Sequence, residues 1–380
     1  MRILFLLIVL GEVLCMRSQT FRHNGSLYSV LSGKDVELLQ YNPEISTDTM
    51  FVWGQVKHRK KMYNVVSIAA EAFHGDWKDA YHSVKHISIA DGIEYIASDA
   101  LCGKFCNLLS ITIPPSMKSI GSNAFANIPS LNEAVVRGGD KVSDWGFSLN
   151  PSLYRVVLDS CISEIGENAF FNCTRLTNID LTGVDLIGEH AFECTGLESI
   201  SLPKVGRIGD FAFSNCRNLE KVNFSNQYCY IGDFAFLNNT ALKHLRLNSA
   251  SIGECVFMGC SSLQTIVLAD SVKHIGSAAF LGCTSLNELE MSASISRIES
   301  MTFMDCVNLE EVTIPQTVTY IGESAFEGTG IREIVIPPSV VKIEKHAFRN
   351  CENLTKIIIS RSTVELGQDV ADENVILEYK

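Results

Sequence analysis

Residues 165–181 read IGENAFFNCTRLTNIDL, and variants of this phrase recur along most of the chain. IGDFAFSNCRNL begins at residue 208, IGSAAFLGCTSL at 275 and IEKHAFRNCENL at 343. From residue 120 to residue 343 the phrase begins eleven times at a mean spacing of about 22 residues, which is the period of a solenoid of stacked coils. With weaker copies at residues 68 and 96, we expect about thirteen coils of 21–24 residues each.

Each copy predicts the shape of one coil. Leu176, Ile179 and Leu181 alternate with polar residues, which indicates a strand that buries one face. The Ala-Phe pair, here Ala169 and Phe170, predicts a short helical turn on which each Phe stacks against the Phe of the next coil. Glycine at the second position of most copies indicates a corner that needs a permissive backbone. The sequence therefore predicts an α/β repeat in which parallel strands stack to form the core.

The repeated phrase resembles the BspA-like leucine-rich repeats, IG-x-x-AF-x-x-C-x-x-L-x-x-I-x-IP, across residues 67–360. The preceding stretch NGSLYSVLSGKDVELLQ, residues 24–40, is similar to the β-hairpin cap at the front of such proteins. The resemblance implies a leucine-rich-repeat solenoid that acts by binding, often in adhesion or host contact, without catalytic residues. We expect a cap over residues 18–66, the solenoid over 67–360 and a C-terminal cap over 361–380.

Residues 1–17, MRILFLLIVLGEVLCMR, predict a signal peptide because one early positive charge precedes a short apolar run. The alternative is a buried N-terminal helix or strand. No later stretch reaches the roughly 20 apolar residues that span a bilayer. We therefore expect a secreted, extracellular protein without a membrane span, either free or associated with the cell surface.

Composition and motifs narrow the function classes. Acidic residues number 43 against 31 basic ones, a net charge of −12, which disfavours nucleic acid as a partner. The chain lacks the H-E-x-x-H, G-x-S-x-G and P-loop motifs, so we expect no enzyme and no cofactor. One insertion offers a candidate metal or acid–base cluster: His74, Asp76, Asp79, His82 and His86. Its alternative is a solvated insertion that packs Trp77 and Tyr81, and this alternative is favoured.

The basic run at residues 57–61 suggests sulfated glycans or acidic lipid as ligands, but a hairpin tip that faces water is the favoured interpretation.

Most cysteines fall in the C-x-x-L position of successive coils, where Asn239 and Thr329 also occur. A position occupied by Cys, Asn or Thr requires a small side chain that can bond to the turn backbone. We therefore interpret these cysteines as buried structural thiols, with disulfides between coils as the alternative. A metal site is disfavoured because one column of thiols offers no tetrahedral geometry. We expect this ladder to contain Cys173, Cys194, Cys216, Cys260, Cys283, Cys306 and Cys351. Cys102 and Cys106 are the expected disulfide pair, and Cys161, Cys229 and Cys255 lie off the ladder.

Outward strand residues are the candidate binding residues. Two columns run along the predicted sheet, basic in the middle and acidic in the C-terminal third. The candidates are Lys221, Asn223, His244, Arg246, Glu288, Glu290, Glu311 and Glu333. If the strands pair, Glu288, Glu311 and Glu333 would stack about 4.8 Å apart, where either water or a cationic partner such as Ca²⁺ offsets their repulsion.

This pattern predicts non-enzymatic binding of an extracellular protein or glycan, in adhesion or in host or matrix recognition. The first alternative is a secreted structural or matrix protein that associates with copies of itself. The remote alternative is a polysaccharide-acting β-helix enzyme, which would require clustered carboxylates in a groove.

Overall fold

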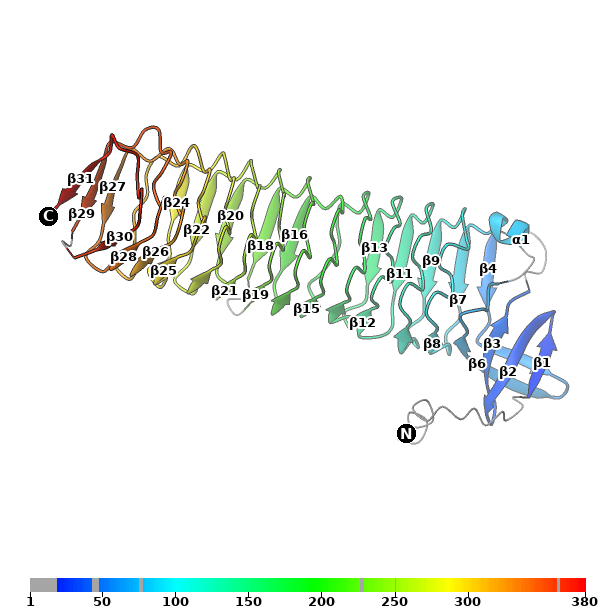
Figure 1. The fold of residues 1–380 in the computed structure, drawn as a ribbon. Helices are drawn as coiled ribbons and strands as arrows, with labels where there is room; N and C mark the ends of the chain where they lie inside the picture. Colours follow the sequence, from blue (N-terminus) through cyan, green and yellow to red (C-terminus); the bar gives the residue numbers. More distant parts are fainter. Residues whose placement is uncertain (1–18, 43–47, 75–77, 226–228, 250, 361–362) are drawn as a thin grey trace.

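The computed structural model describes residues 19–42, 48–74, 78–225, 229–249, 251–360 and 363–380 and shows a rod of stacked coils (Figure 1). It is a parallel β-solenoid of about 13 turns, which confirms the predicted fold. Among the described residues one helix is present, α1 (Lys78–Ser83), at the front of the solenoid. The predicted signal peptide lies outside the described residues.

Hairpins form the front of the molecule. Antiparallel pairs join β1 to β2, β2 to β3, and β5 to β6. The bounds of these strands are β1 (Thr20–His23), β2 (Ser26–Ser32), β3 (Asp35–Gln40), β5 (Gln55–His58) and β6 (Lys61–Ile68). His58 pairs with Lys61, so Arg59 and Lys60 form the two-residue loop between β5 and β6. The basic run is therefore a hairpin tip, as the favoured interpretation states.

One side of the rod carries strands of mostly four residues in parallel sheets. They are β4 (Thr49–Val52), β7 (His86–Ile89), β9 (Ser110–Ile113), β11 (Glu133–Val136), β13 (Arg155–Leu158), β16 (Ser199–Leu202), β18 (Lys221–Phe224), β20 (His244–Leu247), β22 (Thr265–Leu268), β24 (Glu288–Glu290), β27 (Glu333–Ile336), β29 (Lys356–Ile359) and β31 (Ile376–Tyr379). We call these the broad sheets. Their residues alternate as predicted: in β16, Ile200 and Leu202 are buried while Ser199 and Ser201 are exposed.

A second side carries two-residue strands, which also pair in parallel from coil to coil. They are β8 (Tyr95–Ile96), β10 (Ser119–Ile120), β12 (Lys141–Val142), β14 (Glu164–Ile165), β15 (Leu186–Ile187), β17 (Arg207–Ile208), β19 (Tyr230–Ile231), β21 (Ser251–Ile252), β23 (His274–Ile275), β25 (Arg297–Ile298), β26 (Tyr320–Ile321), β28 (Lys342–Ile343) and β30 (Glu365–Leu366).

The parallel pairing extends beyond the range 67–360 at both ends. β4 pairs with β7 at the front, and β31 pairs with β29 at the back.

The turn with the Ala-Phe pair forms the third side of each coil. It is not the expected short helical turn, because left-handed residues interrupt it, such as Asn168 (φ 54°) and Asn172 (φ 58°). Its backbone instead bonds to the neighbouring coil: the N–H of Phe170 donates to the carbonyl of Ala191 at 2.8 Å.

The recurrent glycines serve close packing between coils rather than an unusual backbone angle. A Cβ on Gly209 would lie 2.6 Å from the backbone nitrogen of Glu189, and the φ of Gly209 is not left-handed. This corrects the expectation of a corner that needs backbone freedom.

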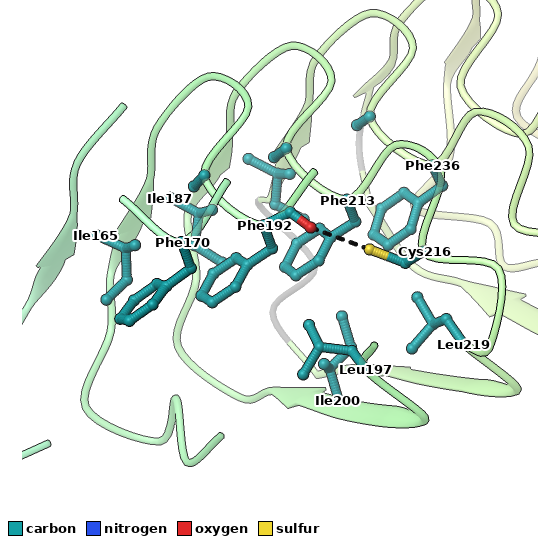
Figure 2. Packing of buried hydrophobic residues seen from close by; sticks show 14 of the residues in the cluster. Ile165, Phe170, Ile187, Phe192, Leu197, Ile200, Phe213, Cys216, Leu219 and Phe236 are labelled. Atoms are coloured by element: carbon teal, nitrogen blue, oxygen red, sulfur yellow. Dashed lines mark hydrogen bonds between the residues drawn. The ribbon is translucent and has the colours of Figure 1, made fainter. Parts of the chain in front are cut away.

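A column of stacked phenylalanines fills the core (Figure 2). Among the described residues, twelve Phe side chains are fully buried: Phe105, Phe125, Phe147, Phe170, Phe192, Phe213, Phe236, Phe257, Phe280, Phe303, Phe326 and Phe348. From Phe125 to Phe348 the centroids of neighbouring rings lie 5.1 to 5.7 Å apart. Because each ring packs between coils, the core exists only in the stack. The predicted Phe column is confirmed.

The ladder cysteines bond to the turn backbone. Figure 2 shows the thiol of Cys216 donating to the carbonyl of Phe192 in the preceding coil, at 3.1 Å. Equivalent bonds of 3.1 to 3.4 Å come from Cys173, Cys260, Cys283, Cys306 and Cys351, all buried. These six residues confirm the prediction of buried structural thiols.

Two cysteine predictions are wrong. Cys194 is half-buried and left-handed (φ 58°), and the buried Thr195 fills the ladder position beside it. This coil is one residue shorter between its Phe and Leu, which displaces the cysteine. The expected disulfide is absent as well: Cys102 and Cys106 are free, the first half-buried and the second exposed.

Candidate binding face

The outward side of the broad sheets, from β4 to β31, is here called the broad face. All eight predicted binding residues are exposed to solvent. Seven of them lie on strands of the broad sheets: Lys221 and Asn223 on β18, His244 and Arg246 on β20, Glu288 and Glu290 on β24, and Glu333 on β27. Since buried residues alternate with them, the core fixes the direction of each strand.

The structure brings the basic pair of β20 close to the acidic pair of β24. In the parallel register His244 lies opposite Thr265, which lies opposite Glu288. The second row runs from Arg246 through Val267 to Glu290 in the same strands. Neighbouring strands lie about 4.8 Å apart, so the opposite charges are separated by roughly 10 Å.

Hydrogen bonds connect the first row. The hydroxyl of Thr265 donates to a carboxylate oxygen of Glu288 at 3.3 Å. Nδ1 of His244 lies 3.3 Å from the same hydroxyl oxygen, which accepts when that nitrogen carries a proton. The sequence did not reveal this link, because it runs through Thr265, an uncharged residue between His244 and Glu288.

The acidic column is less regular than the sequence suggests. Glu311 lies in residues 311–314, which have no strand assignment, so Glu288 and Glu333 belong to separate sheets. The gap falls where like charges on adjacent strands would oppose pairing. A shallow hollow of about 490 Å³ lies there, with Glu311, Glu333 and Val335 in its lining.

Basic residues accompany the acidic ones at this end. Arg332 forms an ion pair of 2.7 Å with Glu310. Lys356 lies opposite Glu333 in register, and its hydrogen bond to Glu378 raises the pKa of its ammonium group. A cationic partner that bound the acidic column would therefore compete with Arg332 and Lys356 of the chain itself for the carboxylates.

In β29 one residue at an outward position of the strand is buried. Ile358 is 7% exposed, although its alternation in β29 predicts an outward direction. In register it lies between Val335 and Glu378.

The front of the broad face holds an aromatic pair that the repeat pattern does not reveal. Phe51 and Trp53 on or beside β4 are 48% and 65% exposed, while Met50 and Val52, which alternate with them, are buried. The alternation in residues 49–53 carries the strand signal, but it precedes the recognisable repeats.

The predicted histidine cluster is not assembled by the described residues. His82 lies on α1 and His86 on β7, so the two do not share a helix face. His86 instead contacts the hydroxyl of Ser110 at 2.7 Å, and His74 pairs with Glu71. Asp76 lies outside the described residues, and the side chain of Asp79 is not described. Within the described part of the chain, no three His, Cys, Asp or Glu side chains form a metal-binding group.

None of the helices described is long and apolar enough to cross a membrane.

Comparisons with known proteins agree with this architecture. The model of the family described as BspA type leucine rich repeat region matches residues 48–141, 140–251 and 250–374. None of the curated proteins compared with this chain matches it. A leucine-rich repeat protein from Bacteroides ovatus has 22% sequence identity and a TM-score of 0.67, over 95% of this chain and 99% of that chain, which shows the fold. A leucine rich cell surface protein from Faecalibacterium prausnitzii has 24% identity and a TM-score of 0.47, over 90% of this chain and 95% of that chain.

Proposed function

This chain belongs to the BspA-type leucine-rich repeat family, and from that membership we propose that it is a non-enzymatic extracellular binding protein that holds a protein or glycan on its broad face. The row from Arg246 through Val267 to Glu290 is the observation that carries the proposal. It presents opposite charges at a fixed spacing on strands anchored by the core. A ligand with complementary charges would meet this surface without ordering a loop, which lowers the entropic cost of binding.

The extracellular location is part of the proposal. A signal peptide over residues 1–17 would direct the chain out of the cell, where contact with host or matrix surfaces follows. Adhesion is the role that such a surface supports best, because many weak contacts along one rod add through avidity.

The test uses the full recombinant chain on an array of extracellular matrix proteins and glycans. Charge reversal of Lys221 and Arg246 together (K221E and R246E) is expected to weaken binding to the best array member at least tenfold. Binding should also fall as salt rises, because exposed charges are screened. The matched control reverses Arg137 and Lys273, which are exposed but lie outside the broad sheets.

Equal loss of binding in both double variants would contradict a site on the broad face. Two further measurements address the other hypotheses. Concentration-dependent growth in light scattering without an array ligand would favour the self-associating matrix protein. Release of reducing sugar from a polysaccharide would favour the enzyme.

A further inference from the structure

A hollow of about 420 Å³ lies at the front of the molecule, between the hairpins and β4. Its volume falls within the range of pockets that hold small ligands. The walls come from three places: His23, Asn24 and Ser26 at the β1–β2 turn, Asn42 after β3, and Phe51 with Trp53 at β4. Five strands of the broad sheets, β7 to β16, separate it from the charged residues of β18 to β27.

The aromatic pair gives this hollow a platform. The ring centroids of Phe51 and Trp53 lie 5.8 Å apart with an interplanar angle of 27°. The hydroxyl of Tyr41 donates to the carbonyl of Phe51 at 3.4 Å, which ties the platform to the hairpins. Trp53 is 65% exposed, and an exposed aromatic at the mouth of a hollow is typical of a binding site.

The polar groups of the lining are amides, hydroxyls and one imidazole, from Asn24, Asn42, Gln55, Ser26, Tyr28, Tyr41, Thr49 and His23. No Asp, Glu, Lys or Arg is found among the described residues that line the hollow. The β1–β2 turn is held in place because Ser26 accepts a bond from the backbone nitrogen of Asn42 at 2.9 Å and the amide of Asn42 donates to the carbonyl of Asn24 at 3.2 Å. The carbonyl oxygen of the Asn42 amide and that of the Gln55 amide accept no hydrogen bond within the described part of the chain.

We propose that this hollow, here called the cap pocket, binds a neutral pyranose ring of a glycan. One face of such a ring carries C–H groups that pack on Trp53, while its hydroxyls donate to the amide oxygens of Asn42 and Gln55. Among the described lining residues, a charged ligand would meet no Asp, Glu, Lys or Arg. A purely apolar ligand would leave the amides unsatisfied. A proline-rich peptide needs an extended aromatic groove, whereas the two exposed rings, Phe51 and Trp53, are only two residues apart in the chain.

The proposal does not depend on the charged rows of the broad face. The cap pocket binds through stacking and neutral hydrogen bonds, so its affinity should change little between low and high salt. Ligand binding by the charged rows of β18 to β27 should decline over the same range. Failure of one site is thereby distinguishable from failure of the other.

The experiment titrates the full chain with soluble cellotetraose, maltotetraose, mannotetraose and chitotetraose and follows tryptophan fluorescence. The protein is produced in a host without N-glycosylation, because Asn24 begins an N-x-S acceptor in the pocket wall. Saturable binding of at least one sugar is expected, with a change in tryptophan emission. Trp53→Ala should weaken it at least tenfold.

Trp145→Ala is the matched control, since Trp145 is 38% exposed but lies outside the pocket lining. It should bind the sugar like the unchanged protein. Gln55→Ala is the second variant, and it should weaken binding severalfold without removing an aromatic ring. Circular dichroism establishes that each variant is folded. Equal affinities for the Trp53 and Trp145 variants would overturn the proposal. So would binding of no neutral sugar, or preferential binding of an anionic sugar or a proline-rich peptide.

Discussion

At the scale of single residues, the ladder position, which is the first of C-x-x-L in each coil, determines which side chain donates a hydrogen bond to the carbonyls of the Phe turn. The occupant is usually a thiol, and Asn150 shows that an amide also fits: its nitrogen donates to the carbonyls of Phe125 and Phe147 at 2.9 and 2.8 Å. Its oxygen accepts from the backbone of Ile128 at 2.7 Å. Asn239 occupies the same position and is fully buried, yet neither of its amide atoms has a hydrogen-bond partner among the described residues.

Asn239→Cys is therefore expected to raise the free energy of unfolding by about 1 to 2 kcal/mol, because a buried polar group without a partner costs about that much. Denaturant melts followed by circular dichroism measure the change. Asn150→Cys is the matched control, and it should destabilise because it removes three hydrogen bonds. Stabilisation by both substitutions would contradict the role assigned to the hydrogen bonds.

The sequence predicts whether a residue is buried only in coils that keep the regular spacing of the repeat. It places Cys173 and Cys216 correctly because their coils have the same Phe-to-Cys spacing, and it misplaces Cys194 because a deletion follows that Phe. It also misjudges the glycines, since the space beside Gly209 depends on the neighbouring coil.

At the scale of the repeated element, the strand and the Phe turn have different structural roles. The strands set the direction of exposed side chains, and the stacked rings hold the coils together. Alternation in the sequence predicts strands such as β16 well. It does not reveal that residues 178–181 and 311–314 have the same pattern without a strand assignment, because strand pairing depends on both neighbours.

Phe213→Ala is expected to lower the free energy of unfolding by about 3 to 5 kcal/mol, because the ring is fully buried and its loss leaves a cavity. Rings stack on both of its faces, at 5.2 and 5.1 Å. Phe348→Ala should cost less, because among the described rings it stacks only on Phe326.

Denaturant melts combined with hydrogen exchange measure both changes, since a repeat protein opens coil by coil. The control is Phe51→Ala, which removes an exposed ring and should cost less than about 1 kcal/mol. Equal costs for Phe213 and Phe51 would show that the stack contributes little to stability.

At the scale of the whole molecule, the period predicts the rod but not what lies at its front. The cap pocket could not be derived from the sequence, because its walls come from segments without a repeat. The spacing of Asn24, Asn42 and Trp53 along the chain gives no sign that they meet. The sequence does predict which side chains of the broad face point outward. A shift of strand register by one residue would turn the buried side chains to solvent, so the alternation of apolar and polar residues is strongly constrained.

The buried thiols couple the stability of the whole rod to alkaline pH. Burial raises the pKa of Cys173, Cys216, Cys229, Cys260 and Cys306 from the ordinary value of 9.0 to about 12. A thiolate at Cys216 could no longer donate to the carbonyl of Phe192. In the unfolded chain the same thiols lose their protons near pH 9, so their contribution to stability is complete below that pH and is lost as the pH rises towards 12.

The free energy of unfolding should therefore fall between pH 9 and pH 12, by up to about 1.4 kcal/mol per pH unit for each thiol. Other groups titrate in this range, so the comparison is between variants. Cys216→Thr with Cys306→Thr should fall less steeply with pH, because threonine fills the same position at Thr195 and Thr329 and does not ionise. Cys161→Thr is the control, since that thiol is exposed, and its pH profile should match that of the unchanged protein. If all three profiles coincide, the ladder thiols do not control alkaline unfolding; a shallower slope in the double variant alone assigns the loss of stability to them.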